Sequence, residues 1–176
     1  MLALANPEQV KGLIAFNTEI PNHRPPWIPT YQFLAALPLA NPIFRLTMKS
    51  KLWQASPLGF GQFYSNKSYF KDDSNLGPYL DPVLTSAKRM AGLLGYIRGI
   101  EWDVIDQLQH RHSAIKADVL LLWGESDKTF PVKLAHEMVS QFGGAAKLIP
   151  IAASLLPHEE APRETLEHIT KFVDHD

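Results

Sequence analysis

Three short apolar runs limit what this chain can fold into more than any other feature of its sequence. They span residues 10–16 (VKGLIAF), 118–124 (DVLLLWG) and 146–151 (AKLIPI), and the second, with five consecutive apolar residues, is the strongest. Continuous apolar runs without alternation are typical of strands that are covered on both faces, as in a parallel sheet. Pro150 cannot donate a hydrogen bond to a neighbouring strand, so the third strand is expected at an edge of the sheet.

Each of the last two runs is followed by a stretch with helical spacing. Residues 131–142 begin with a proline and end at two glycines, and residues 162–173 again begin with a proline. Proline suits the first turn of a helix, and glycine suits the residues just after its end. The C-terminal third is therefore predicted to run strand, helix, strand, helix. Right-handed crossovers would place these strands side by side.

The middle of the chain differs, because residues 19–112 contain no convincing strand. Seven of the fourteen prolines lie between Pro21 and Pro57, and they predict a loop-rich stretch. Residues 56–64 (SPLGFGQFY) are predicted to form a glycine-bearing loop. Residues 81–100 are predicted to form one helix with Asp81 as its N-cap.

Composition excludes several classes of function. The 176 residues suffice for one domain with a sizeable core, and a net charge of −1 with no run of lysine and arginine gives no sign of a nucleic-acid partner. The absence of cysteine excludes disulfides and thiolate chemistry. No apolar run reaches the ~20 residues that cross a bilayer, so no membrane partner is expected. The N-terminus lacks a signal-peptide pattern, and these features together fit a cytoplasmic protein.

The stretch LLLWGESDKTFP carries the most chemical information. A buried strand ends at Gly124, and Asp127 follows three residues later in a loop. Sites in open parallel sheets form beyond the carboxyl ends of the strands, which is where Asp127 is expected. Spacing alone leaves two readings open: a working carboxylate, or a residue that caps its own loop.

Three segments resemble the α/β-hydrolase superfamily. IKADVLLLWGESDKTFP resembles the segment of that family in which a strand ends in WGxxD and the aspartate orients the catalytic histidine. AKLIPIAASLLPHEEAPRETLEHITKF is similar to the last strand, the histidine loop (GHxxxxExP) and the final helix. ALANPEQVKGLIAFNT resembles the end of the helix after the nucleophile, followed by the next strand.

The resemblance implies a fold class. It is an α/β protein with a partial α/β-hydrolase fold, about three parallel strands with flanking helices and an inserted helical, loop-rich cap. Residues 1–176 would form one partial domain, and 19–112 would be the inserted cap, most reminiscent of haloalkane dehalogenases and epoxide hydrolases. The family's chemistry needs no metal or cofactor, so none is expected. His110 and His112 are two residues apart, but a metal site would need further ligands that cannot be identified.

The chain departs from the family pattern in its catalytic parts. It contains no G-x-S-x-G or G-x-D-x-G nucleophile motif and no HG-type oxyanion segment. Ser126 in GESDK lacks the second glycine of such a motif. These gaps suggest a truncated hydrolase, a start site placed too late or a decayed gene product. They predict no meaningful turnover by this polypeptide alone.

The histidine of the last loop is also out of register. Counting back from the E-x-P formed by Glu160 and Pro162, the expected catalytic position is Leu155, and His158 lies three residues later. One reading makes His158 a surface or helix-entry residue that only resembles the base. The other shifts the loop so that His158 reaches Asp127. The candidate catalytic residues are thus Asp127 and His158.

Two functions follow from this pattern. The first is the C-terminal part of a hydrolase that acts on a small organic substrate, namely an ester, an epoxide or a haloalkane. The alternative is a non-catalytic binding module, in which Leu155 forms an apolar pocket wall. In either case an inner strand, residues 10–16, would become an edge, so self-association through that edge is expected.

Overall fold

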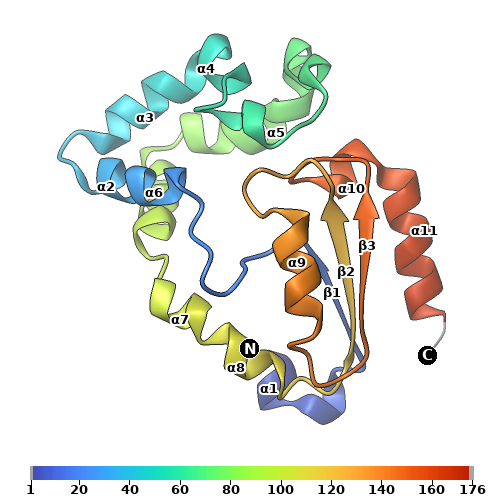
Figure 1. Cartoon of the computed structure of the whole chain (residues 1–176). Helices are drawn as coiled ribbons and strands as arrows, with labels where there is room; N and C mark the ends of the chain where they lie inside the picture. The colour runs from blue at the N-terminus through green and yellow to red at the C-terminus, as the bar shows by residue number, and fades with distance from the viewer. Residues whose placement is uncertain (1, 175–176) are drawn as a thin grey trace. The chain divides into compact units, whose positions relative to one another are not determined.

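Three parallel strands form the sheet of this protein. The structure is a computed structural model that describes residues 2–174, apart from the side chains of Lys71, Asp73 and Ser74. β1 (Gly12–Phe16), β2 (Asp118–Gly124) and β3 (Ala146–Ile151) lie in the order β1-β2-β3 (Figure 1). All three predicted strands are confirmed, although β1 begins two residues later than predicted, at Gly12 rather than residue 10. The partial α/β architecture is therefore the observed one.

The central position of β2 in the sheet explains why its residues are apolar without alternation. Val119 and Leu121 pack into a cluster with helix α9 (Val132–Val139), on one face of the sheet. Leu120 and Leu122 pack into a second cluster, which helix α11 (Pro162–Val173) covers on the other face (Figure 1). Successive side chains of a strand point to opposite faces, so a strand covered on both sides needs apolar residues at every position.

The sheet belongs to a compact unit made of the residues up to His23 and those from Trp102 onward. Besides the strands and the two long helices, it contains only short elements. These are α1 (Leu2–Ala5), η1 (Pro7–Gln9), α7 (Trp102–Asp106), α8 (Leu108–His112) and α10 (Pro157–Glu160). Within the described range 2–174, no helix has the length and apolar character that crossing a membrane requires.

A second compact unit, Arg24–Glu101, is inserted in the chain between β1 and β2. It is helical, with no strand among its described residues. Its elements are α2 (Trp27–Ala36), α3 (Ala40–Lys49), α4 (Lys51–Ala55), η2 (Phe60–Gln62), η3 (Lys67–Lys71), α5 (Asp73–Leu84) and α6 (Ala87–Arg98). The predicted insertion of residues 19–112 contains this unit, and its role as a cap stays a prediction.

The two ends of the insertion are tied together within the sheet-bearing unit. The backbone N–H of Asn22 donates to Asp106 Oδ1 at 2.9 Å, and Asn22 Nδ2 donates to Gln109 Oε1 at 3.0 Å. Asn22 has a φ of 62°, a left-handed conformation that asparagine tolerates better than most residues. The outgoing chain after β1 and the returning chain in α7 and α8 are therefore clamped side by side.

The proline-rich stretch is more helical than predicted. Pro29 is the third residue of α2 and Pro42 the third residue of α3. The first-turn N–H groups of a helix have no intrahelical acceptor, so a proline there removes no hydrogen bond. These prolines stand near helix beginnings rather than in long loops, which is why counting them overestimated the loop content.

The prediction of one helix over residues 81–100 is wrong. Asp81 and Pro82 lie inside α5, which ends at Leu84, and a second helix, α6, begins at Ala87. Ser86 is the actual N-cap, since its Oγ accepts a hydrogen bond from the Arg89 N–H at 3.3 Å. Sequence spacing favoured Asp81 because an acid before a proline is a common helix start, but the chain had already become helical upstream.

The outer edge of β1 is unpaired. Lys11 O accepts from the Asp118 N–H, and the Asn17 N–H donates to Leu122 O. Pairing in a strand alternates, so the odd-numbered residues of this segment bond to β2, while Gly12, Ile14 and Phe16 direct their N–H and C=O groups outward. Among the described residues, no hydrogen bond reaches these outward groups. An open edge of this kind is a template for another strand.

We expect the purified protein to self-associate through this edge as its concentration rises. Ile14→Pro removes an outward N–H that β2 does not use, so the strand should persist while edge pairing is blocked. Ile14→Val keeps that N–H and serves as the matched control. Sedimentation equilibrium should show association for the wild type and Ile14→Val but a monomer for Ile14→Pro, with circular dichroism confirming that each is folded. A wild type that stays monomeric at all concentrations would contradict the prediction.

Candidate functional site

Asp127 lies in the loop after the central strand, at the carboxyl end of the sheet. Its side chain is buried, with 5% of the residue exposed. Asp127 Oδ1 accepts a hydrogen bond from the Thr129 N–H at 2.7 Å, which closes a tight turn within the loop. Oδ2 accepts a second bond from Asn17 Nδ2 at 2.6 Å. The carboxylate is therefore held in one orientation from two sides.

Asn17 links the ends of two neighbouring strands. It follows β1 with a φ of 28°, and its Oδ1 accepts a hydrogen bond from the Gly124 N–H at 2.9 Å. The same amide donates to Asp127, so one side chain satisfies a backbone donor of β2 and orients the carboxylate. Sequence analysis did not pair Asn17 with Asp127. The signal that could have found the pair is the position of both residues just beyond the ends of adjacent parallel strands.

Burial is the main influence on the acidity of Asp127. Loss of hydration disfavours the charged carboxylate and raises the pKa of Asp127 above its ordinary value. The hydrogen bonds from Asn17 and from the Thr129 backbone oppose this effect because they stabilise the charged form. A buried carboxylate with a displaced pKa, at the edge where sites form in parallel sheets, is a candidate functional group with a physical basis.

The loop after β3 runs directly beside the Asp127 loop. The Glu125 N–H donates to Ile151 O at 2.9 Å, and the Ser126 N–H donates to Ala153 O at 3.0 Å. Gly124 allows this approach because a Cβ atom there would collide with the carbonyl group of Ser154. Residues that follow Ser154 therefore begin next to Asp127.

Glu160 sets the register of that second loop. Its Oε2 accepts a hydrogen bond from the Ser154 N–H at 2.6 Å, which joins the start of the loop to the end of α10. The glutamate of the E-x-P pattern is thus the residue that holds the loop in place. This contact gives a structural reason for counting back from Glu160, and that count leads to Leu155.

Leu155 packs on the α9 side of the sheet, against the cluster that contains Trp123 and Phe130. Phe130 is three residues from Asp127, and the chain just before Leu155 is hydrogen-bonded to the Asp127 loop. The position expected for a catalytic base is therefore occupied by an apolar side chain that extends the core.

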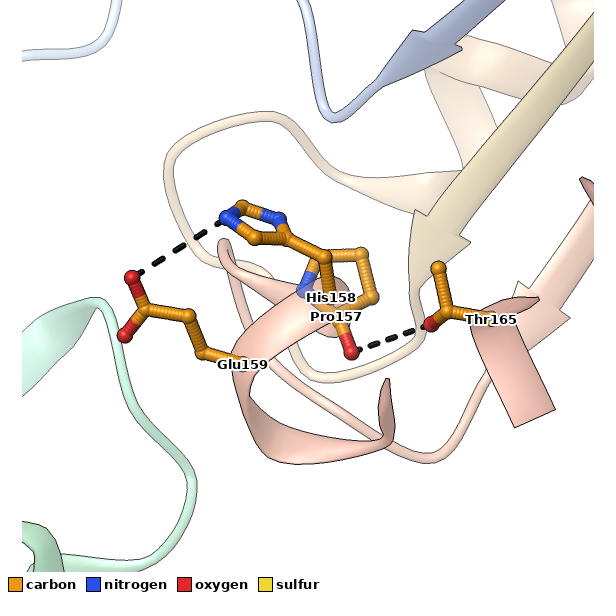
Figure 2. A network of polar contacts seen from close by, with 4 residues as sticks. All are labelled: Pro157, His158, Glu159 and Thr165. Atoms are coloured by element: carbon orange, nitrogen blue, oxygen red, sulfur yellow. Dashed lines mark hydrogen bonds and ion pairs between the residues drawn. The ribbon is translucent and has the colours of Figure 1, made fainter. Parts of the chain in front are cut away.

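His158 contacts Glu159 and Phe16. Its Nε2 lies 3.9 Å from Glu159 Oε1, its side chain is 46% exposed, and Figure 2 shows the two side chains facing each other at the beginning of α10. Its ring also packs edge-on against Phe16, with 5.4 Å between the ring centroids. Thr165 Oγ1 donates to Pro157 O at 3.1 Å and fixes the helix turn that carries the histidine. Among the described residues, no hydrogen bond or ion pair joins His158 to Asp127.

Another histidine, which sequence analysis did not single out, supports the Asp127 loop. His23 Nε2 lies 2.7 Å from the Thr129 carbonyl oxygen, and its ring packs edge-on against Phe130 at 6.2 Å. A ring nitrogen that bonds to a carbonyl must carry the proton, so His23 donates to the backbone two residues after Asp127. No sequence signal pointed to it, because it precedes the inserted unit and lies 104 positions before Asp127.

His112, one of the two histidines considered as metal ligands, has a structural role. His112 is buried, bonds through Nδ1 to Gln141 at 3.1 Å and stacks on Phe142, and burial lowers the pKa of its imidazole. Within the part of the chain that the structure describes, no group of three or more histidine, cysteine or acidic side chains could hold a metal ion.

Comparisons with known proteins address the fold. No protein-family model matches the sequence, and no curated protein is significantly similar to it. Several solved structures, however, are similar to this chain in fold. An α/β hydrolase fold protein from Burkholderia ambifaria superimposes with a TM-score of 0.68 at 18% identity, over 96% of this chain and 60% of its own. This chain has part of the α/β-hydrolase fold.

Two further solved structures show the same similarity of fold. The enol-lactonase from Burkholderia xenovorans LB400 has a TM-score of 0.67 at 14% identity, over 98% of this chain and 60% of its own. A thermophilic esterase from Thermogutta terrifontis has a TM-score of 0.63 at 18% identity, over 98% of this chain and 59% of its own. This chain thus spans about three fifths of the length of these α/β-hydrolase-fold structures.

Asp127 should give the stability of the protein an unusual pH dependence. A carboxyl whose pKa is raised in the folded state binds its proton more tightly there than in the unfolded chain, where its pKa is near 3.8. Its contribution to the free energy of unfolding therefore falls as the pH rises from that value through the folded pKa.

Urea unfolding of the wild type and Asp127→Asn between about pH 4 and 7 isolates this contribution. The free energy of unfolding of the wild type minus that of the variant should decrease as the pH rises. An increase across the same range would mean that the hydrogen bonds of Asn17 and Thr129 outweigh burial, contrary to this expectation.

Replacing Leu155 with histidine should introduce an imidazole beside Asp127. The variant Leu155→His is expected to place the ring next to the carboxylate, which should raise the imidazole pKa by about one unit or more. Leu156→His is the matched control, because it places an imidazole one residue further along the same loop. NMR titration should show that adding Asp127→Asn lowers the pKa of the ring introduced at position 155 but not that of the ring at 156. Equal responses would contradict the assignment of position 155.

Proposed function

We propose that this chain is the C-terminal part of a hydrolase with the α/β-hydrolase fold that acts on a small organic substrate. The observation that carries this proposal is the buried Asp127, held by Asn17 just beyond the central strand and flanked by the loop that leads to Leu155. A carboxylate in this place suits the orientation of an imidazole base. In the proposal Asp127 has that role in the complete enzyme.

The proposed chemistry needs partners that this polypeptide does not supply. Acyl transfer and related hydrolyses of this fold use a nucleophile, an imidazole base and donors that stabilise an oxyanion. The chain has neither a G-x-S-x-G nor a G-x-D-x-G motif, and Leu155 stands at the base position. Loss of a single oxyanion donor typically costs about 100-fold or more in rate. We therefore propose that the chain does not turn over substrate by itself.

The substrate class is an ester, an epoxide or a haloalkane. An esterase and an enol-lactonase among the structural neighbours favour an ester, whereas the proposed cap, residues 19–112, is most reminiscent of haloalkane dehalogenases and epoxide hydrolases. The type of nucleophile would narrow this choice. The absence of cysteine supports the proposed cytoplasmic location of this enzyme.

A non-catalytic binding module is the second candidate. The observation that favours it is the apolar Leu155, which packs with Trp123 and Phe130 where a base would otherwise stand. In that case Asp127 is a structural residue that joins the ends of β1 and β2. Native mass spectrometry of the purified protein would then find an intact small molecule bound, with no cleavage product.

Turnover by the purified chain tests the proposal directly. With para-nitrophenyl butyrate, styrene oxide and dibromoethane, we expect rates equal to those of buffer. Rapid cleavage that disappears in Asp127→Asn or His158→Ala alone would refute the proposed inactivity.

The coding DNA upstream of Met1 separates the two candidate functions. If it encodes in frame a strand, a G-x-S-x-G or G-x-D-x-G motif and a helix, the extended protein should hydrolyse one of these substrates. Hydrolysis by that protein would require an imidazole beside Asp127, from His158 or from the upstream segment. Asp127→Asn should then lower kcat by about 10⁴-fold, because that imidazole would lose its orientation. An extended protein that remains inactive would favour the binding module.

A further inference from the structure

The inserted unit Arg24–Glu101 has a cavity of its own. It measures about 540 Å³ and lies among α2, α3, α4 and the segment that follows them. Every residue that lines it belongs to this unit, and none belongs to the Asp127 loop. Its size falls within the range of pockets that hold small molecules, which is about 300–1,000 Å³.

The walls of this cavity are mainly apolar, with both aromatic and aliphatic side chains. Trp27, Phe44 and Trp53 contribute rings, and Leu34, Ile43 and Leu58 contribute aliphatic side chains. Several of these side chains remain accessible, with Ile43 54% exposed and Leu58 72% exposed. No lysine, arginine, histidine, aspartate or glutamate lines the cavity. A charged ligand would therefore lose its hydration without gaining a partner, whereas a neutral ligand would not.

Contacts within the unit form the cavity before any ligand arrives. The Tyr31 hydroxyl donates to the Leu58 carbonyl oxygen, which joins α2 to the segment after α4. The Tyr31 ring also packs edge-on against Phe44 on α3, with 6.2 Å between centroids, and Trp53 packs edge-on against Phe60 at 5.2 Å. A pre-formed wall lowers the entropy lost when a ligand binds.

Besides the Tyr31 hydroxyl, which donates to the Leu58 carbonyl oxygen, two hydroxyl groups interrupt the apolar lining. Thr30 on α2 and Thr47 on α3 both line the cavity, and neither hydroxyl has a hydrogen-bond partner among the described residues. Binding pockets commonly combine an apolar lining with a few polar groups that orient the ligand. These hydroxyls can donate to or accept from one polar group of a ligand.

We propose that this cavity binds a neutral, mainly apolar small molecule with a single hydrogen-bonding group, such as a medium-chain alcohol, ketone or ester. The aliphatic or aromatic part of the ligand occupies the space among the tryptophan and leucine side chains. Its polar group meets Thr30 or Thr47. This inference goes beyond the proposed hydrolase function, because no residue of the sheet contributes to the cavity.

Octanol tests the proposal without being a substrate for ester, epoxide or haloalkane hydrolysis. NMR spectra of protein with isotope-labelled isoleucine methyl groups should show a saturable shift of Ile43, which lines the cavity. Ile151, fully buried in the sheet, should not shift. Octanoate, the charged analogue, should bind at least about tenfold more weakly. Absence of a saturable Ile43 shift would overturn the proposal.

A pair of variants on α3 provides the matched control. Ile43→Glu introduces a charge into the cavity and should weaken octanol binding by about tenfold or more. Leu46→Glu introduces the same charge on the same helix outside the cavity, at a side chain that is 75% exposed, and should leave the affinity unchanged. Equal losses in both variants would mean general adsorption to an apolar surface and would overturn the site.

One further variant keeps this test separate from the hydrolase proposal. Asp127→Asn should leave octanol binding unchanged, since Asp127 does not line the cavity. Loss of binding in Asp127→Asn, with the fold intact by circular dichroism, would refute a site confined to the inserted unit. Binding that persists in a chain without any turnover would uphold this site whatever the outcome for the hydrolase function.

Discussion

The hydrogen bonds of Asn17 hold together the edge of the sheet on which any function of this site depends. Its amide oxygen accepts from Gly124 and its amide nitrogen donates to Asp127, so one residue joins the ends of β1 and β2 and orients the carboxylate. Each of these groups is buried, and leaving either unpaired would cost about 1–3 kcal/mol. The site is therefore part of what makes the end of the sheet stable.

That dual role explains why Asp127 alone does not reveal a reaction. A carboxylate that two donors already hold is satisfied as a structural residue, yet it retains lone pairs that an imidazole could use. Glu160 places Leu155, not His158, in the adjacent loop position. His158 contacts Glu159 and Phe16 instead. The site thus combines an acid in a functional position with an apolar neighbour where a base is expected.

The strands and the helices that follow them could be predicted well, because the signals that identify them lie in short stretches of sequence. An apolar run such as Val119–Trp123, ended by a glycine, suffices to identify a buried strand. Prolines mark the starts of the two long helices that follow, since Pro131 is the N-cap of α9 and Pro162 is the first residue of α11. The inserted unit was harder to predict, because Pro29 and Pro42 suit either a loop or a first helical turn. Asn17 was missed as a partner of Asp127 because only their shared place beyond adjacent strand ends links them, and His23 left no signal at all in local spacing.

The clamp at Asn22 has a consequence for how such a chain can change over time. Asn22, just before the inserted unit, is hydrogen-bonded to Asp106 and Gln109, just after it. The two ends of the insertion are therefore held together within the sheet-bearing unit. For a flexible segment, doubling the length raises the entropic cost of closure by only about 0.6 kcal/mol. Residues beyond the clamp can therefore be gained, lost or exchanged with little effect on the strand register, so the proposed ligand cavity can change without altering the sheet.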